Sequence, residues 1–191
     1  MGFPDRRPAP PGRAGWSRLG IVALTSILLA GCGLFDRSVP PPCPRVSILG
    51  DAAQMVVFRP GPGRDLTDVE YEGEISNVQP KCEYIKKNTV IDMTVTLELI
   101  ATRGPAAATG KPGHLPFFVS VIERGTSRIL GKATFDSALE FLPGKRRAGS
   151  SEEIAQTIPL GPGKTGVDYE ILVGFQLTEE QLQYNRKQRG F

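Results

Sequence analysis

Residues 90–102 read Val-Ile-Asp-Met-Thr-Val-Thr-Leu-Glu-Leu-Ile-Ala-Thr, and this stretch decides the fold class. Large apolar side chains occupy every second position from Ile91 to Leu99, and polar side chains stand between them. Successive side chains of a β-strand point to opposite faces of its sheet, so the pattern predicts a strand with one dry and one wet face.

Shorter segments with the same period lie on both sides of this strand, separated by turns rich in Gly and Pro. The predicted strands are 46–49, 54–58, 69–78, 117–122, 129–135, 138–142, 154–158 and 169–177. Many short strands of this kind predict an all-β domain, an antiparallel immunoglobulin-like β-sandwich of seven to nine strands. Val167-Asp168-Tyr169 resembles the tyrosine corner of immunoglobulin-like domains.

One short C-terminal helix is predicted over 179–187. Thr178 is placed to cap it, and Gln181 three residues later completes a capping box. Leu177 and Leu182 have the spacing of a hydrophobic staple.

The charge balance argues against a nucleic-acid partner. The chain has 23 Lys and Arg against 20 Asp and Glu. Four Arg and one Asp fall in residues 1–31, which leaves 19 basic and 19 acidic residues from Cys32 onward. A protein that binds nucleic acid needs an excess of positive charge on its binding face, so no nucleic-acid partner is expected.

The first 31 residues have the layout of an export signal. A basic, Pro-rich leader precedes the apolar run 19–31, which at about 13 residues is shorter than the roughly 20 that a membrane-spanning helix needs. The run ends in Leu29-Ala30-Gly31-Cys32. A buried helix with a chance Cys is the alternative reading.

With its leader, this tetrapeptide resembles the lipobox of bacterial lipoprotein precursors, and the chain resembles uncharacterised Gram-negative envelope lipoproteins. The resemblance implies diacylglycerol on the Cys32 sulfur, cleavage of the signal peptide 1–31 between Gly31 and Cys32, and a further acyl chain such as palmitate on the new amino group. Two or three acyl chains give a lasting membrane anchor. Gly33 stands where an Asp implies inner-membrane retention, so export by the Sec route to the outer membrane is expected.

Residues 32–44 form a lipidated, Pro-rich tether, and 45–191 form the predicted periplasmic β-sandwich domain. If Cys32 carries lipid, Cys43 and Cys82 remain as an even pair. The periplasm is oxidising, which predicts a Cys43–Cys82 disulfide. Two free thiols or a metal site are the alternatives, and the second is weak because His114 is the only histidine and no Cys-x-x-Cys occurs.

Several polar groups invite a catalytic interpretation. Gly163-Lys164-Thr165 imitates the end of a phosphate-binding loop, but Ile158 stands where the motif requires its first Gly. His114 is expected in a solvated loop. The sequence contains no Gly-x-Ser-x-Gly nucleophile elbow that would go with a catalytic histidine. Glu70, Glu72 and Glu74 would share one face of a strand. They could form a solvated surface, bind a cation or supply a glycosidase carboxylate pair.

Two basic clusters and one internal echo are the remaining candidates. Lys145-Arg146-Arg147 and the C-terminal Arg186, Lys187 and Arg189 are charged loops or contacts for phosphate headgroups or an acidic partner. Gly61-Pro62-Gly63-Arg64 is echoed by Gly161-Pro162-Gly163-Lys164. If both turns lie at one end of the domain, they form a binding tip.

The expected function is that of a lipid-anchored, periplasm-facing envelope lipoprotein that acts as a non-catalytic binding or accessory module. No enzyme activity, no metal and no cofactor apart from the covalent lipid on Cys32 are expected. Its partners would be the lipid bilayer and an envelope protein. The alternatives are a periplasmic hydrolase acting on cell-wall material and an accessory subunit of a secretion or outer-membrane assembly complex.

Overall fold

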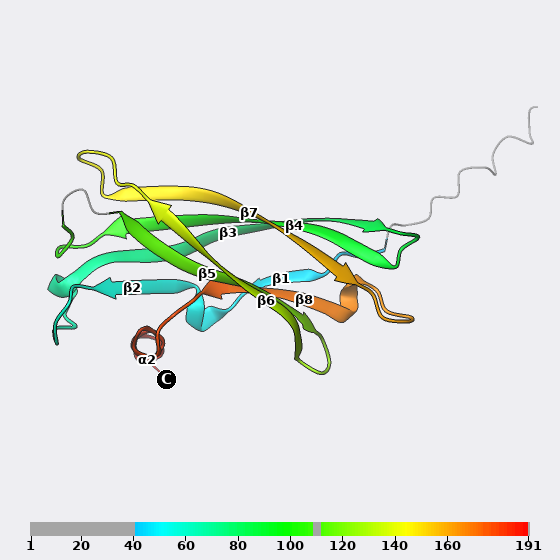
Figure 1. The fold of residues 1–191 in the computed structure, drawn as a ribbon. Helices are drawn as coiled ribbons and strands as arrows, with labels where there is room; N and C mark the ends of the chain where they lie inside the picture. The colour runs from blue at the N-terminus through cyan, green and yellow to red at the C-terminus, as the bar shows by residue number, and fades with distance from the viewer. Residues whose placement is uncertain (1–40, 109–111, 191) are drawn as a thin grey trace, which may run out of the picture. The chain divides into compact units, whose positions relative to one another are not determined.

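The computed structural model describes residues 41–108 and 112–190 of the chain. The described residues form eight strands, three short 3₁₀ turns and one α-helix (Figure 1). The strands are β1 Arg45–Ile48, β2 Gln54–Phe58, β3 Val69–Ile85, β4 Val90–Arg103, β5 Gly113–Glu123, β6 Arg128–Leu139, β7 Arg147–Pro159 and β8 Tyr169–Phe175. The turns are η1 Gly50–Ala52, η2 Leu66–Asp68 and η3 Gly166–Asp168, and the helix is α2 Glu179–Gln188.

The strands make two four-stranded sheets. One sheet has the order β1-β8-β5-β6, and the other has the order β2-β3-β4-β7. All ladders are antiparallel except the parallel edge pair of β1 and β8. The described residues are mostly β. A single cluster of buried apolar residues draws on both sheets, so the arrangement is sandwich-like.

The alternating stretch of β4 supplies the middle of this cluster. Its inward side chains are almost fully buried: Ile91, Met93, Val95, Leu97 and Leu99. Between them, Asp92 and Glu98 are exposed, as the period of two predicts. The opposite sheet contributes a matching row from β5 and β8, in which Phe117 and Phe175 are each 1% exposed.

Gly73 of β3 faces this row at close range. A Cβ on Gly73 would lie 2.6 Å from Leu115 and 3.2 Å from Phe175. The two sheets therefore approach closely at this point because a glycine leaves the space.

Four strands, β3, β5, β6 and β7, run several residues further than their sequence pattern predicts. β3 continues through Pro80 to Ile85 because it stays paired with β4 to its end, whereas β2 pairs only with residues up to Glu74. In the described part of the chain, Pro80 therefore lies where β3 has a single ladder neighbour, β4. A strand with one free side can accommodate a missing N–H group. The predicted strand 138–142 is not separate, since β6 runs unbroken from Arg128 to Leu139.

The connectivity differs from the immunoglobulin order. Immunoglobulin domains distribute successive strands as A-B-E-D and C-F-G. Here β2, β3 and β4 are consecutive neighbours in one sheet, and β5 and β6 are neighbours in the other. The sequence pattern shows which face of a strand is dry but not which strand lies beside it, so it does not establish an immunoglobulin-like strand order.

Helix α2 begins and ends close to its predicted bounds. The Thr178 hydroxyl accepts from the Gln181 backbone N–H, and the Gln181 side chain accepts from the Thr178 N–H, so the predicted capping box is present. Leu177 packs against the core ahead of the helix. α2 lies beside β2, which is an edge strand of its sheet (Figure 1).

Candidate functional site

A disulfide and hydrogen bonds hold the first described residues, 41–44, against one end of the domain. Cys43 and Cys82 form the predicted disulfide, with their Cα atoms 6.0 Å apart. The Tyr84 hydroxyl donates to the Pro42 carbonyl at 2.7 Å and accepts from the Gly166 N–H at 2.7 Å. Residues 41–44, expected as the last part of the tether, thus contact the domain. We call this region the joining end.

The predicted tyrosine corner contributes to the same end. Tyr169 is 3% exposed, and its hydroxyl accepts from the Gly161 N–H at 3.0 Å. The Gly163-Lys164-Thr165 segment lies in the turn between Gly161 and η3. Lys164 donates to Glu123, and this hydrogen bond lowers the pKa of Glu123 and raises that of Lys164. Lys164 is therefore already engaged with a carboxylate of its own chain.

The echoed turn lies at the other end of β3. Gly61-Pro62-Gly63-Arg64 precedes η2 and the first residue of β3, Val69, whereas Tyr84 near the last residue of β3 contacts the joining end. Fifteen residue steps lead from Val69 to Tyr84, which is about 50 Å at a rise of ~3.3 Å per residue. The hypothesis of a shared binding tip is therefore wrong. We call the region around Gly61–Arg64 the far end.

Both echoed turns have the same local role. Each leads into a 3₁₀ turn with a capping box, closed by Asp68 after the first and by Asp168 after the second. Arg64 pairs with Glu180 of α2, as Lys164 pairs with Glu123. The repeated sequence thus starts two strands.

His114 belongs to β5 and not to a loop. Its Nδ1 lies 2.8 Å from Asp136 Oδ2 on the neighbouring strand β6, and both side chains are about half exposed. Its carbonyl accepts from the Tyr71 hydroxyl at 2.9 Å, and burial raises the pKa of Tyr71. The His114–Asp136 pair is thus a cross-strand contact on the outer face of a sheet.

Three arginines of the basic clusters are also engaged within the domain. Arg146 donates to the Arg103 carbonyl at 3.3 Å, and the Arg103 guanidinium lies 4.8 Å from the ring centre of Phe141. At the C-terminus, Arg186 and Arg189 both pair with Asp51, at 3.1 and 3.5 Å.

A polar groove lies between α2 and the solvent-facing side of β2 and β3. Its volume is about 250 Å³, and its walls include Glu72 and Glu74 from β3 and Tyr184, Gln188 and Arg189 from α2. Glu72 and Glu74 are exposed, as the alternation predicts, whereas Glu70 is partly buried and outside the groove. Two carboxylates beside a guanidinium can bind a small polar or cationic group.

The groove exists because α2 covers the free edge of β2. The Asn185 amide donates to the carbonyls of Asp51 and Gln54 at 2.9 and 2.8 Å, and Gln181 donates to the Val56 carbonyl at 3.1 Å. Asn185 is 7% exposed. Sequence reasoning found the helix but not this role, since a polar residue in a polar helix carries no signal of burial.

Gly31 and Cys32, the predicted cleavage and lipidation residues, lie outside the described residues. Within residues 41–108 and 112–190, no helix has the length and apolar character that crossing a bilayer requires. The same residues contain no group of three or more His, Cys, Asp or Glu side chains arranged to hold a metal ion.

Comparison with known proteins adds no relative: no family model, no curated protein and no solved structure matches this chain.

Proposed function

We propose that this protein is a lipid-anchored, periplasm-facing envelope lipoprotein whose β-domain is a non-catalytic binding or accessory module. The observation that carries the proposal is the segment Leu29-Ala30-Gly31-Cys32 at the end of a basic leader and a short apolar run. A thiol is the nucleophile that a thioether-linked lipid requires, and small residues before it let a peptidase approach the backbone. Gly33 after the Cys favours the outer membrane.

The Cys43–Cys82 disulfide supports export. Disulfides persist in oxidising compartments such as the periplasm and are rare in the cytosol. The bridge lies close behind the proposed anchor, since ten residues separate Cys32 from Cys43. In the extended polyproline geometry that three consecutive prolines favour, ten residues span about 30 Å at ~3 Å each. The joining end would therefore stay near the membrane surface.

The domain itself supports a binding role. Two sheets facing each other across one core give a rigid sandwich-like body. The polar side chains that the sequence singled out mostly contact partners in their own domain: Lys164 with Glu123, His114 with Asp136 and Arg186 with Asp51. These contacts stabilise the fold and leave the loops and sheet edges for recognition.

The groove beside α2 favours one second candidate, a periplasmic hydrolase acting on cell-wall material. Glu72 and Glu74 supply two carboxylates at one cavity. Both come from the same strand, however, whereas paired catalytic acids flank the bond that they cleave. If the protein releases soluble fragments from peptidoglycan and Glu72→Gln together with Glu74→Gln abolishes the release, the hydrolase replaces the binding module.

The anchor is tested by fractionating cells of a lipoprotein-processing bacterium that express the full chain. We expect the wild type in the membrane fraction, labelled by radioactive palmitate, and Cys32→Ser unlabelled and released from the membrane. The control is Cys43→Ser with Cys82→Ser, which removes two thiols but retains Cys32, and should keep both label and membrane retention. Equal retention and labelling of Cys32→Ser would refute the anchor.

A further inference from the structure

The four edge strands of the two sheets differ in how they are protected. β2 is covered by α2, and β1 is only four residues long. β7 carries one positively charged residue, Arg147, and two adjacent negatively charged residues, Glu152 and Glu153. β6 is twelve residues long and contains no Pro, and among the described strands β5 is its only ladder neighbour. An unpaired edge of this length is a template for another strand.

The free side of β6 can be identified from the hydrogen bonds of its neighbour. The Gln176 N–H donates to the Pro116 carbonyl, so even-numbered residues of β5 direct their backbone groups toward β8, and odd-numbered residues direct theirs toward β6. In the β5–β6 register, the odd-numbered residues of β5 face Gly131, Ala133 and Phe135. The backbone groups of Lys132, Thr134 and Asp136 therefore point away from the sheet.

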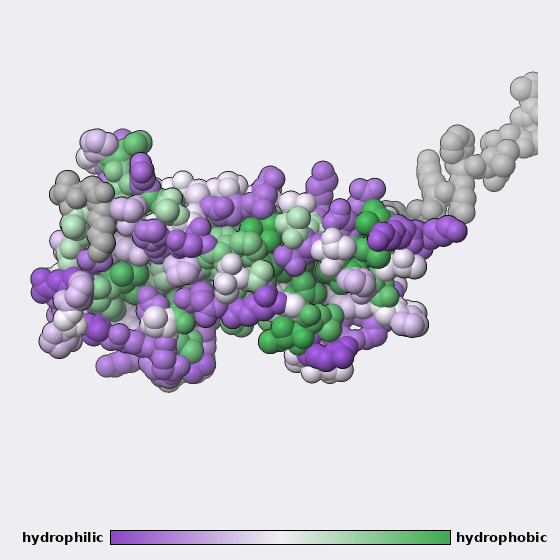
Figure 2. Space-filling model, viewed as in Figure 1, coloured by the Kyte–Doolittle hydropathy of each residue, from purple (hydrophilic) through white to green (hydrophobic). Residues whose placement is uncertain are grey.

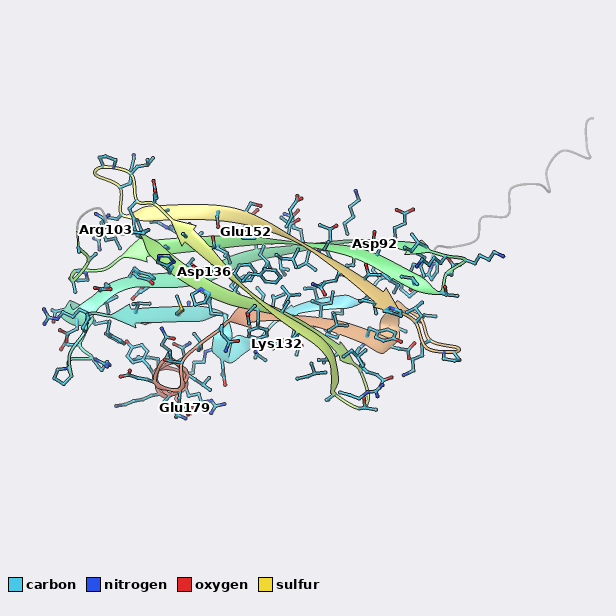
Figure 3. The ribbon with its side chains drawn as sticks, viewed as in Figure 1. Asp92, Arg103, Lys132, Asp136, Glu152 and Glu179 are labelled. Carbon is cyan, nitrogen blue, oxygen red and sulfur yellow. A yellow bond between two sulfur atoms is a disulfide. The ribbon has the colours of Figure 1, made fainter. Side chains whose placement is uncertain are left out.

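The contacts of β6 with the other sheet include an inward side chain. Ser137, which is 4% exposed, reaches across to Ser150 and Glu152 of β7 at 2.9 and 2.6 Å. Lys132, Thr134 and Asp136 are exposed. Figure 3 labels Lys132 and Asp136 along β6, and Glu152 on β7.

The charges along β6 are arranged in mirror order. Lys132 precedes Thr134 by two residues, and Asp136 follows Thr134 by two residues. If two copies of β6 run antiparallel about a two-fold axis at Thr134, Lys132 of each copy lies opposite Asp136 of the other. Oppositely charged residues directly across an antiparallel pair stabilise it.

The same two-fold axis also pairs the backbone hydrogen-bonding groups of the two strands. Thr134 faces Thr134 as a hydrogen-bonded pair, and the outward groups of Lys132 and Asp136 exchange hydrogen bonds across the interface. The bulge beside Val121 and Ile122 marks where this regular ladder ends. At that point Ile129 and Leu130 are 62% and 43% exposed, and apolar surface is visible beside the tip of the β5–β6 hairpin (Figure 2).

We propose that β6 is a self-association edge, through which two copies of this chain join their β1-β8-β5-β6 sheets into one continuous sheet. The partner is a second copy because the charge order of β6 is complementary to itself. A C2 interface of this kind is closed, so assembly stops at the dimer. The inference does not depend on the lipid anchor.

The test is sedimentation equilibrium of the full chain carrying Cys32→Ser, over micromolar to millimolar concentrations. We expect a monomer–dimer equilibrium. Lys132→Glu places like charges across the axis twice and should raise the dimer Kd roughly tenfold. Lys132→Asp combined with Asp136→Lys exchanges the charges and should restore the wild-type Kd within about threefold.

Proline substitutions test the backbone ladder separately. Thr134→Pro removes the outward N–H on the axis and should abolish the dimer, while Ser151→Pro, at an exposed position of β7, should leave it intact. Circular dichroism verifies that each variant folds, and the charge variants decide the question if Thr134→Pro does not. A monomer at all concentrations, an open-ended assembly, or a charge-exchanged variant that fails to recover would overturn the proposal.

Discussion

Removing the disulfide is expected to cost the domain a large part of its stability. Cys43 precedes β1 of one sheet and Cys82 lies in β3 of the other, so the bridge joins the two sheets at the joining end. It closes a loop with a sequence separation of 39 residues. For a loop of this size the chain-entropy relation gives about 4 kcal/mol of stabilisation at 25 °C.

The perturbation is Cys43→Ser with Cys82→Ser, and the assay is urea unfolding followed by circular dichroism. With a slope near 2 kcal/mol/M, about 4 kcal/mol corresponds to a midpoint about 2 M lower in urea. Addition of a reductant should lower the wild-type midpoint by the same amount and leave the double variant unchanged. If removing the bridge shifts the midpoint by less than about 0.5 M at an unchanged slope, the bridge does not restrict the unfolded chain as argued.

Three further predictions concern named contacts. Asn185→Ala leaves two carbonyls at the edge of β2 without a donor and should lower the free energy of unfolding by about 2 kcal/mol, measured by urea unfolding. Gly166→Ala drives a Cβ into the Pro42 carbonyl and should cost about 1–3 kcal/mol in the same assay. The hydrogen bond from Lys164 lowers the pKa of Glu123 below its ordinary value of 4.5, so this pair stabilises the fold above that pH. The stabilisation is lost as the pH falls through the lowered pKa. Glu123→Gln should therefore reduce the loss of stability at acid pH, measured by thermal unfolding at a series of pH values.

Each of these predictions has a matched comparison. Gln183→Ala removes an exposed side-chain contact on the same helix and should cost less than about 0.5 kcal/mol. Gly131→Ala adds a Cβ where no heavy atom lies within 4 Å and should be tolerated. Lys164→Met should reproduce the pH profile of Glu123→Gln. The assigned contacts would be contradicted if Gln183→Ala cost as much stability as Asn185→Ala, or Gly131→Ala as much as Gly166→Ala. They would also be contradicted if the Glu123 and Lys164 variants both lost stability with falling pH as the wild type does.

Local patterns predicted the elements of this fold well. The alternation from Ile91 to Leu99 identified the central core strand, and the Thr178–Gln181 capping box located the helix. These signals are visible because each residue is constrained by the next few along the chain. The Cys43–Cys82 bridge followed from residue chemistry, since the resemblance to lipoproteins assigned Cys32 to lipid.

Arrangements between distant segments were not predictable in this way. The placement of β2, β3 and β4 side by side depends on long-range pairing, which the period of a strand does not encode. The passage of β3 through Pro80 depends on where β2 ends. The groove beside α2 requires Asn185 to bond the edge of β2, more than a hundred residues away in the chain.

The account rests on the covalent fate of one thiol, and intact mass spectrometry of the protein purified from bacterial envelopes measures it directly. The proposal predicts a polypeptide that begins at Cys32, carries the added mass of diacylglycerol and a further acyl chain, and contains the Cys43–Cys82 bridge. A chain that still begins at Met1, with no added lipid mass, would contradict it.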